Sequence, residues 1–98
     1  MKVIISDRAK IDLAKILAYI LILNRKSAQT LDARFRDKIS SLAVFPERGR
    51  IRRDLGHGLR VLLVGVYQII YRIETAEVVI LRVIDGRMDI EAAFLDRE

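Results

Sequence analysis

Apolar residues recur every three or four positions in two segments of the first half of the chain, as they do on one face of an α-helix. The stripes are Leu13, Ile16, Leu17 and Ile20 in the first segment and Ala28, Leu31, Phe35, Ile39 and Leu42 in the second. Asp7 and Ser27 are suitable N-caps for these two helices, and Pro46 should end the second one near Phe45. Because only a short turn joins them, the helices should pair as an antiparallel hairpin.

The far end of the first predicted helix, residues 18–23, is apolar on nearly all sides. Such a segment needs burial on more than one face. Arg8 and Asp12 lie four residues apart on another side of the helix and predict an ion pair. We therefore expect this helix to pack on the rest of the domain and also to be covered by a partner protein.

The second half of the chain changes to short runs rich in Val, Ile and Tyr, which strands prefer. Residues 59–64, 66–73 and 77–84 predict three strands, and residues 2–6 predict another at the start of the chain. The turns that join the strands at 59–64, 66–73 and 77–84 are short, so consecutive strands should be antiparallel neighbours. The element order predicts a single α+β domain over residues 1–98, with an N-terminal strand, an antiparallel helical hairpin and a three-stranded antiparallel meander forming one small sheet.

Alternation along the strand 66–73 sorts its side chains onto two faces of the sheet. Tyr67, Ile69, Tyr71 and Ile73 share one face, and Val66, Gln68, Ile70 and Arg72 share the other. The second set is more polar, so we expect it on the side away from the helices. A polar connector, residues 47–58, joins the hairpin to the meander.

Composition narrows the chemistry and the location. The chain has no cysteine and a single histidine, His57, which excludes a disulfide scaffold and a thiolate metal site and argues against a histidine metal cage. The N-terminus has no signal-peptide pattern, and the longest apolar run, residues 16–23, is far shorter than the roughly 20 residues that span a bilayer. We expect a cytoplasmic protein with no metal, no cofactor and no membrane contact.

Arginines carry the candidate binding chemistry. With 18 Lys and Arg against 13 Asp and Glu, the net charge of +5 favours an acidic protein or a nucleic acid as partner. Arg60 and Arg82 lie inside apolar strands, where a guanidinium either finds an internal partner, such as Asp85, or binds an anion of another molecule. Together with Arg72 and Arg87, they are the candidate binding residues.

Catalytic patterns are absent from the sequence. No serine lies in a G-x-S-x-G frame, and there is no phosphate-binding G-x-x-x-x-G-K loop. His57, between two glycines, is predicted to be a solvated turn residue, and the carboxylates of Asp85, Asp89 and Glu91 to balance nearby arginines. The four arginines of the connector are either solvated or suited to sequence-independent phosphate contacts. We therefore predict no catalytic residue.

An ordered series of segments resembles the ParE branch of the RelE/ParE toxin superfamily. The segments are Phe45-Pro46-Glu47-Arg48-Gly49, Asp54-Leu55, Gly58-Leu59-Arg60, VGVYQIIY at 64–71 and LRVIDGR at 81–87. The resemblance implies the toxin of a type II toxin–antitoxin system and a ParD-like antitoxin whose C-terminal segment wraps it. It also implies poisoning of DNA gyrase, a toxin–antitoxin hetero-oligomer, and contact with DNA only through antitoxin or gyrase.

RelE-like members of the superfamily instead cut mRNA on the ribosome, with basic residues and an aromatic hydroxyl, a histidine or a carboxylate as proton carriers. This chain has Phe94 at the tail aromatic, and Asp85 where many ParE-like sequences have histidine. Its connector holds arginines and no lysine, and guanidinium is a poor proton donor. We expect a toxin that acts by binding. The alternatives are a ribosome-dependent endoribonuclease and a degenerate toxin kept as an antitoxin-binding module.

If the strand arginines meet an acidic antitoxin segment in a partly dry recess, losing either of them should weaken antitoxin binding roughly tenfold or more. The expected comparison is Arg60→Ala and Arg82→Ala against Arg34→Ala, since Arg34 lies on the predicted solvent side of the second helix.

Overall fold

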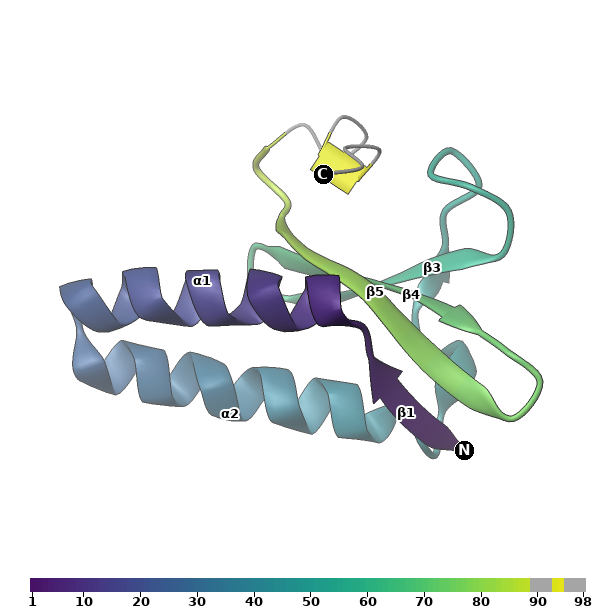
Figure 1. Cartoon of the computed structure of the whole chain (residues 1–98), viewed down its shortest axis with the longest axis horizontal. Coiled ribbons are helices and arrows are strands. Elements are labelled where there is room, and N and C mark those ends of the chain that lie inside the picture. Colours follow the sequence, from purple (N-terminus) through teal and green to yellow (C-terminus); the bar gives the residue numbers. More distant parts are fainter. Residues whose placement is uncertain (89–92, 95–98) are drawn as a thin grey trace.

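Two long helices lie side by side against a five-stranded sheet (Figure 1). The computed structural model describes residues 1–88, 93 and 94. Its elements are β1 (Lys2–Ile5), α1 (Asp7–Leu23), α2 (Arg25–Ser41), the short 3-10 turn η1 (Pro46–Arg48), β2 (Arg50–Ile51), β3 (Leu59–Val64), β4 (Tyr67–Ile73) and β5 (Glu77–Asp85). The predicted order of strand, helical hairpin and meander is confirmed.

The sheet has the order β1-β5-β4-β3-β2. Strands β3, β4 and β5 form the predicted antiparallel meander. Strand β1 pairs with β5 in parallel, with Lys2 opposite Glu77 and Ile5 opposite Ile80. Parallel neighbours need a long crossover, and the two helices begin that connection. The two-residue strand β2, which the polar connector did not predict, adds an antiparallel edge beside β3.

Both predicted helix N-caps are wrong. Ser6 caps α1, because its Oγ accepts a hydrogen bond from the Ala9 N–H at 3.1 Å. Asp7 is instead the first helical residue, where its charge suits the helix dipole. Asn24 caps α2 by accepting from the Ser27 N–H at 2.9 Å. A single extended residue therefore joins the two helices, and α2 begins before the predicted cap.

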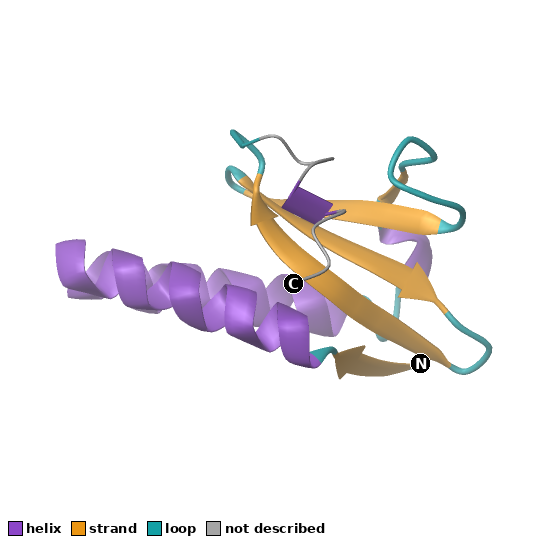
Figure 2. Cartoon of the chain, turned by 45° about the horizontal axis from the view of Figure 1, so that its top comes forward, coloured by secondary structure: helices purple, strands orange, loops and turns teal. Residues whose placement is uncertain are grey.

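Side chains pack on both faces of the sheet. The larger cluster lies between the hairpin and the sheet and contains Phe35, Ile69 and Tyr71, while Ile70 belongs to a second cluster on the other face. Tyr67 and Ile73 pack against the first cluster, so the predicted faces of the five apolar and aromatic residues from 67 to 73 are confirmed. The second cluster also includes Leu55 of the connector and is packed against Phe94 of the tail. Figure 2 shows the short helical segment of residues 93 and 94 on the side of the sheet opposite the helices.

The helical hairpin extends beyond the end of the sheet (Figure 1). A helix of 17 residues is about 25 Å long, so the sheet covers only part of it. At the uncovered end of α1, Tyr19, Ile22 and Leu23 are 64%, 83% and 64% exposed. The apolar segment predicted to need a second covering is thus uncovered in the isolated chain.

Candidate protein-binding surfaces

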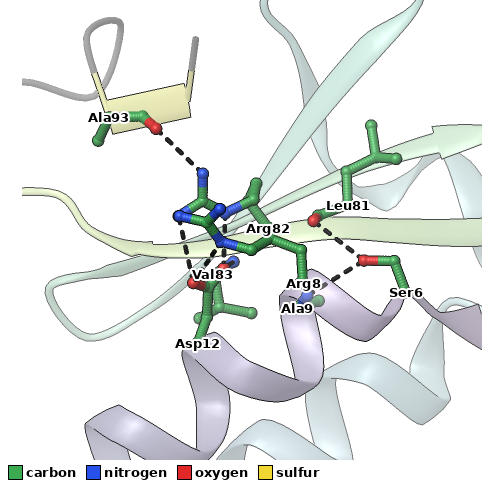
Figure 3. Close-up of polar contacts among 8 residues, drawn as sticks. All are labelled: Ser6, Arg8, Ala9, Asp12, Leu81, Arg82, Val83 and Ala93. Carbon is green, nitrogen blue, oxygen red and sulfur yellow. Dashed lines mark hydrogen bonds and ion pairs between the residues drawn. The ribbon is translucent and has the colours of Figure 1, made fainter. Parts of the chain in front are cut away.

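Arg82 forms an intramolecular ion pair with Asp12 of α1 (Figure 3). The Nε and Nη2 atoms donate to the two carboxylate oxygens at 2.8 and 3.2 Å, and Nη1 donates to the Ala93 carbonyl at 3.0 Å. The Val83 N–H donates to the same carboxylate at 2.9 Å. The predicted alternative partner, Asp85, is not used. Arg8 lies 3.8 Å from Asp12, so the predicted helix pair is present but long.

The local chain path explains why Asp12 reaches this strand. Strand β1 pairs with β5 only as far as Ile80, and the chain then turns into α1. The Ser6 N–H donates to the Ile80 carbonyl at 3.0 Å, and the Ser6 hydroxyl donates to the Leu81 carbonyl at 3.1 Å. Asp12, nearly two helical turns further on, accepts from Val83. The start of α1 therefore satisfies the backbone edge that β1 leaves unpaired.

Arg60 also has internal partners, and it lies on β3, on the other side of β4 from Arg82. Its Nη1 donates to the carbonyls of Gly49 and Glu47 at 2.8 and 3.2 Å. Beside it, the buried Tyr71 hydroxyl donates to the Pro46 carbonyl and accepts from the Gly49 N–H, both at 2.7 Å. Burial raises the pKa of Tyr71, and the Gly49 N–H partly opposes this. Two strand side chains thus fasten the α2–β2 loop (residues 42–49) to the sheet.

The remaining two candidates are more exposed and have acidic neighbours. Arg72 pairs with Glu74, and Arg87 pairs with Asp85 at 2.6 Å. Their side chains are 45% and 69% exposed, against 12% for Arg82. The structure does not gather the four arginines into one recess, because each binds a different internal partner.

Asp85 is held in its ionised form. The Arg87 side chain and backbone N–H lower the pKa of its carboxyl to about 2. Because the folded pKa lies below the unfolded one, the pair stabilises the fold above about pH 4, and this contribution is lost as pH falls from about 4 to 2. An NMR titration of the Asp85 carboxyl should have its midpoint near 2. A midpoint near 4 would show that the pair does not form in solution.

Sequence reasoning missed two of the residues that organise these contacts. Asp12 was assigned to Arg8 alone, although a carboxylate has room for several donors. Tyr71 was placed on the correct face, but its hydroxyl was given no partner. A tyrosine in the middle of an apolar strand is itself a signal, because a buried hydroxyl needs a hydrogen bond.

An apolar groove runs along the hairpin. One stretch, of about 530 Å³, lies where α1 and α2 meet β1, and a second, of about 330 Å³, continues toward the end of the hairpin. Leu17, Asp32 and Arg36 line both stretches. Leu21 and Ile11 of α1 are about half exposed, at 53% and 49%. The groove is suited to an apolar partner segment, and α1 adds further exposed apolar side chains.

Other kinds of site are not seen in the part of the chain described. Residues 1–88, 93 and 94 contain no group of three His, Cys, Asp or Glu placed to hold a metal ion. None of the helices described there is long and apolar enough to cross a membrane. His57 is exposed in a turn, as predicted. Asp89 and Glu91 lie outside the described residues, as do the apolar residues Ile90, Ala92 and Leu95.

Comparison with known proteins places the chain among toxins. Residues 3–90 match the family described as ParE toxin of type II toxin–antitoxin system, parDE. Toxin ParE3 of Caulobacter vibrioides is 49% identical over 51 residues, which are 52% of this chain and 51% of that protein. The match thus spans about half the length of this curated relative.

Two solved structures share the fold. The chromosomal ParDE system from P. aeruginosa has a TM-score of 0.73 and 21% identity, over 85% of this chain and 92% of that one. The toxin–antitoxin complex RelBE2 from Mycobacterium tuberculosis has a TM-score of 0.56 and 30% identity, over 86% and 88%. With nearly the whole length matched to the family and the fold in agreement, the chain belongs to the ParE toxin family of type II toxin–antitoxin systems.

Proposed function

We propose that this toxin acts in the cytoplasm by binding DNA gyrase, and that a ParD-like antitoxin neutralises it by covering the helical hairpin. The match of residues 3–90 to the ParE toxin family carries the proposal. Contact with DNA would be indirect, through gyrase or the antitoxin. The arrangement of proton-carrying groups supports binding over bond cleavage.

Cleavage of RNA through its 2′-hydroxyl needs a base and an acid close to one phosphate. The Asp85 carboxyl is ionised and held by Arg87, so it has no proton to donate at neutral pH. The Tyr71 hydroxyl is buried and bound to backbone on both sides. Phe94 has no hydroxyl, and His57 is an isolated exposed side chain in the connector. These groups either hold the fold or stand alone in the connector, which favours binding over cleavage.

Expression of the chain in cells tests the proposal. Poisoned gyrase leaves cleaved DNA, so a DNA-damage response should precede any loss of protein synthesis. With purified components, the toxin should inhibit supercoiling by gyrase, and His57→Ala should inhibit it equally. Supercoiling that is unaffected at toxin concentrations well above those of gyrase would contradict gyrase as the target.

A ribosome-dependent endoribonuclease is the second candidate, and the 30% identity with RelBE2 is the observation that favours it. In that case translation arrest comes first, and purified toxin cleaves ribosome-bound mRNA. A degenerate toxin would give neither response while still binding the antitoxin.

The antitoxin is expected to place an acidic amphipathic helix in the hairpin groove. The groove floor is apolar, and Lys10 and Arg36 line it against a single acid, Asp32. The whole chain carries +5. An apolar stripe with acidic flanks would therefore match both the shape and the charge of the groove, and give a toxin–antitoxin hetero-oligomer.

Leu21→Asp should weaken antitoxin binding by roughly tenfold or more, because a carboxylate would be buried in the interface without a partner. Leu21 is 53% exposed, so the free toxin should still fold. Isothermal titration measures the affinity, and Val66→Asp is the matched control at an exposed turn residue away from the groove. Equal affinities of the two variants would place the antitoxin elsewhere.

Arg72 and Arg87 remain proposed contacts for the antitoxin or the target, since their exposed guanidinium groups can exchange an internal carboxylate for a partner's. Neither Arg60 nor Arg82 lines the groove, so the predicted loss of antitoxin affinity in Arg60→Ala and Arg82→Ala requires an antitoxin that extends beyond it to these guanidinium groups, whereas Arg34→Ala should have almost no effect. The first two variants need an unfolding curve beside each titration, because both guanidinium groups also hold the fold. Unchanged affinity of folded Arg60→Ala and Arg82→Ala would assign them a structural role alone.

A further inference from the structure

We propose that the exposed part of the α2–β2 loop, residues 44–48, is the surface with which this toxin holds its target. The partner it fits is a protein with an apolar pocket and an acidic rim. The inference rests on the proposed function, in that the toxin acts by binding, and it adds the contact surface and the chemistry of its partner.

The loop exposes apolar side chains at one place. Val44 and Phe45 are 70% and 64% exposed, and together with Pro46 they line a shallow hollow of about 670 Å³. Met1, 48% exposed, is beside them, because its ammonium group donates to the Ala43 carbonyl at 2.8 Å. Half-open apolar hollows of this kind are typical of protein-binding sites, and aromatic residues often dominate their binding energy.

The backbone beneath these side chains is rigidly held. Tyr71 and Arg60 bind the carbonyls of Pro46, Glu47 and Gly49, which are three of the four from Pro46 to Gly49. From α2, the Ser41 carbonyl accepts the Phe45 N–H at 2.9 Å. A loop fixed in this way loses little conformational entropy when a partner binds. The buried tyrosine and the strand arginine thus act as positioning residues for an exposed phenylalanine.

Basic side chains surround the loop and indicate the partner's charge. Arg48, Arg50 and Lys38 line an adjoining hollow of about 340 Å³ beside β3. None of the three forms an ion pair with the residues described here. The only acid in the loop is Glu47. A second copy of the chain would bring like charges together, so charge complementarity favours an acidic protein.

The loop is separate from the groove proposed for the antitoxin. No residue from 44 to 48 lines either stretch of that groove. The two proposals therefore predict opposite phenotypes. Changes in the loop should reduce toxicity and spare antitoxin binding, whereas changes in the groove should do the reverse.

The test compares the Val44→Ala/Phe45→Ala double variant with Leu21→Asp. Both changes are at exposed positions, so circular dichroism should show folded proteins. The loop variant should need tenfold or more protein to inhibit purified gyrase and should arrest growth weakly, with antitoxin affinity unchanged within about twofold. Leu21→Asp should keep full potency and lose antitoxin affinity.

Three results for the loop variant would overturn the proposal. It could keep full potency, it could lose antitoxin affinity to the same extent as potency, or it could lose affinity for duplex DNA while its affinity for gyrase is unchanged. If the unmodified toxin arrests growth without inhibiting gyrase, the target is wrong but the growth assay still decides the role of the loop. A chain that arrests nothing would overturn both proposals.

The positioning role of Tyr71 has its own readout. Tyr71→Phe keeps the buried ring and removes the two hydrogen bonds to the loop. It should lower potency at temperatures where the protein is still folded. In the Tyr71→Phe background, Phe45→Ala should cause a smaller further loss of potency. A loop that is no longer held in place presents the Phe45 side chain to the target less effectively. Strictly additive losses would show that Tyr71 stabilises the fold without positioning Phe45.

Discussion

Asp12→Ala should lower the free energy of unfolding by about 3–5 kcal/mol, because it leaves the Arg82 guanidinium without its carboxylate in a nearly buried position. The two side chains are only 10% and 12% exposed. The Val83 N–H loses its acceptor as well. Domains are typically stable by about 5–15 kcal/mol, so this loss is a large share of the total stability.

Urea unfolding followed by circular dichroism measures this change. The double variant Asp12→Ala/Arg82→Met should recover part of the lost free energy of unfolding. Removing both charges destabilises the fold less than leaving one nearly buried charge without its partner. Asp37→Ala, at an exposed position of α2, is the matched control and should change the stability by less than about 0.5 kcal/mol. A double variant no more stable than Asp12→Ala would contradict an ion pair as the cause.

Gly49→Ala should destabilise the domain by about 1–3 kcal/mol through a clash with Tyr71. An added Cβ would lie 2.6 Å from the Tyr71 Cε1 and hydroxyl oxygen, and the ring is fully buried. The backbone at Gly49 has φ −75° and ψ 155°, which any residue adopts, so the contact alone causes the cost. The α2–β2 loop should shift away from the sheet, and toxicity should fall with it.

Thermal unfolding with and without Tyr71→Phe separates this clash from other effects. Removing the hydroxyl should reduce the cost of Gly49→Ala. Gly58→Ala is the contrast, because Gly58 has φ 73° and no atom within 4 Å of an added Cβ. Its cost comes from the left-handed backbone and should be the same in both backgrounds. If Gly49→Ala is as stable as the unmodified chain, the loop does not sit against Tyr71.

The sequence by itself determined the kinds of element, most of their bounds and the family. Strand β3 begins and ends where the pattern predicted, and β4 starts one residue later. The face of the sheet that carries Ile69 and Tyr71 was also determined. These features depend on the spacing of apolar side chains within one helix or strand, so neighbours in the sequence are sufficient to specify them.

The tertiary structure alone decided which polar groups meet. Arg82 lies 70 residues from Asp12, and the Tyr71 hydroxyl 22 residues from Gly49. The parallel pairing of β1 with β5 and the bulge between Ile70 and Tyr71 bring Arg82 to α1, and neither leaves a mark in the local pattern. A buried charge or hydroxyl forms its hydrogen bonds with the polar groups that the packing places beside it. For Arg60 these groups are backbone carbonyls, which every residue has, so the sequence does not single them out.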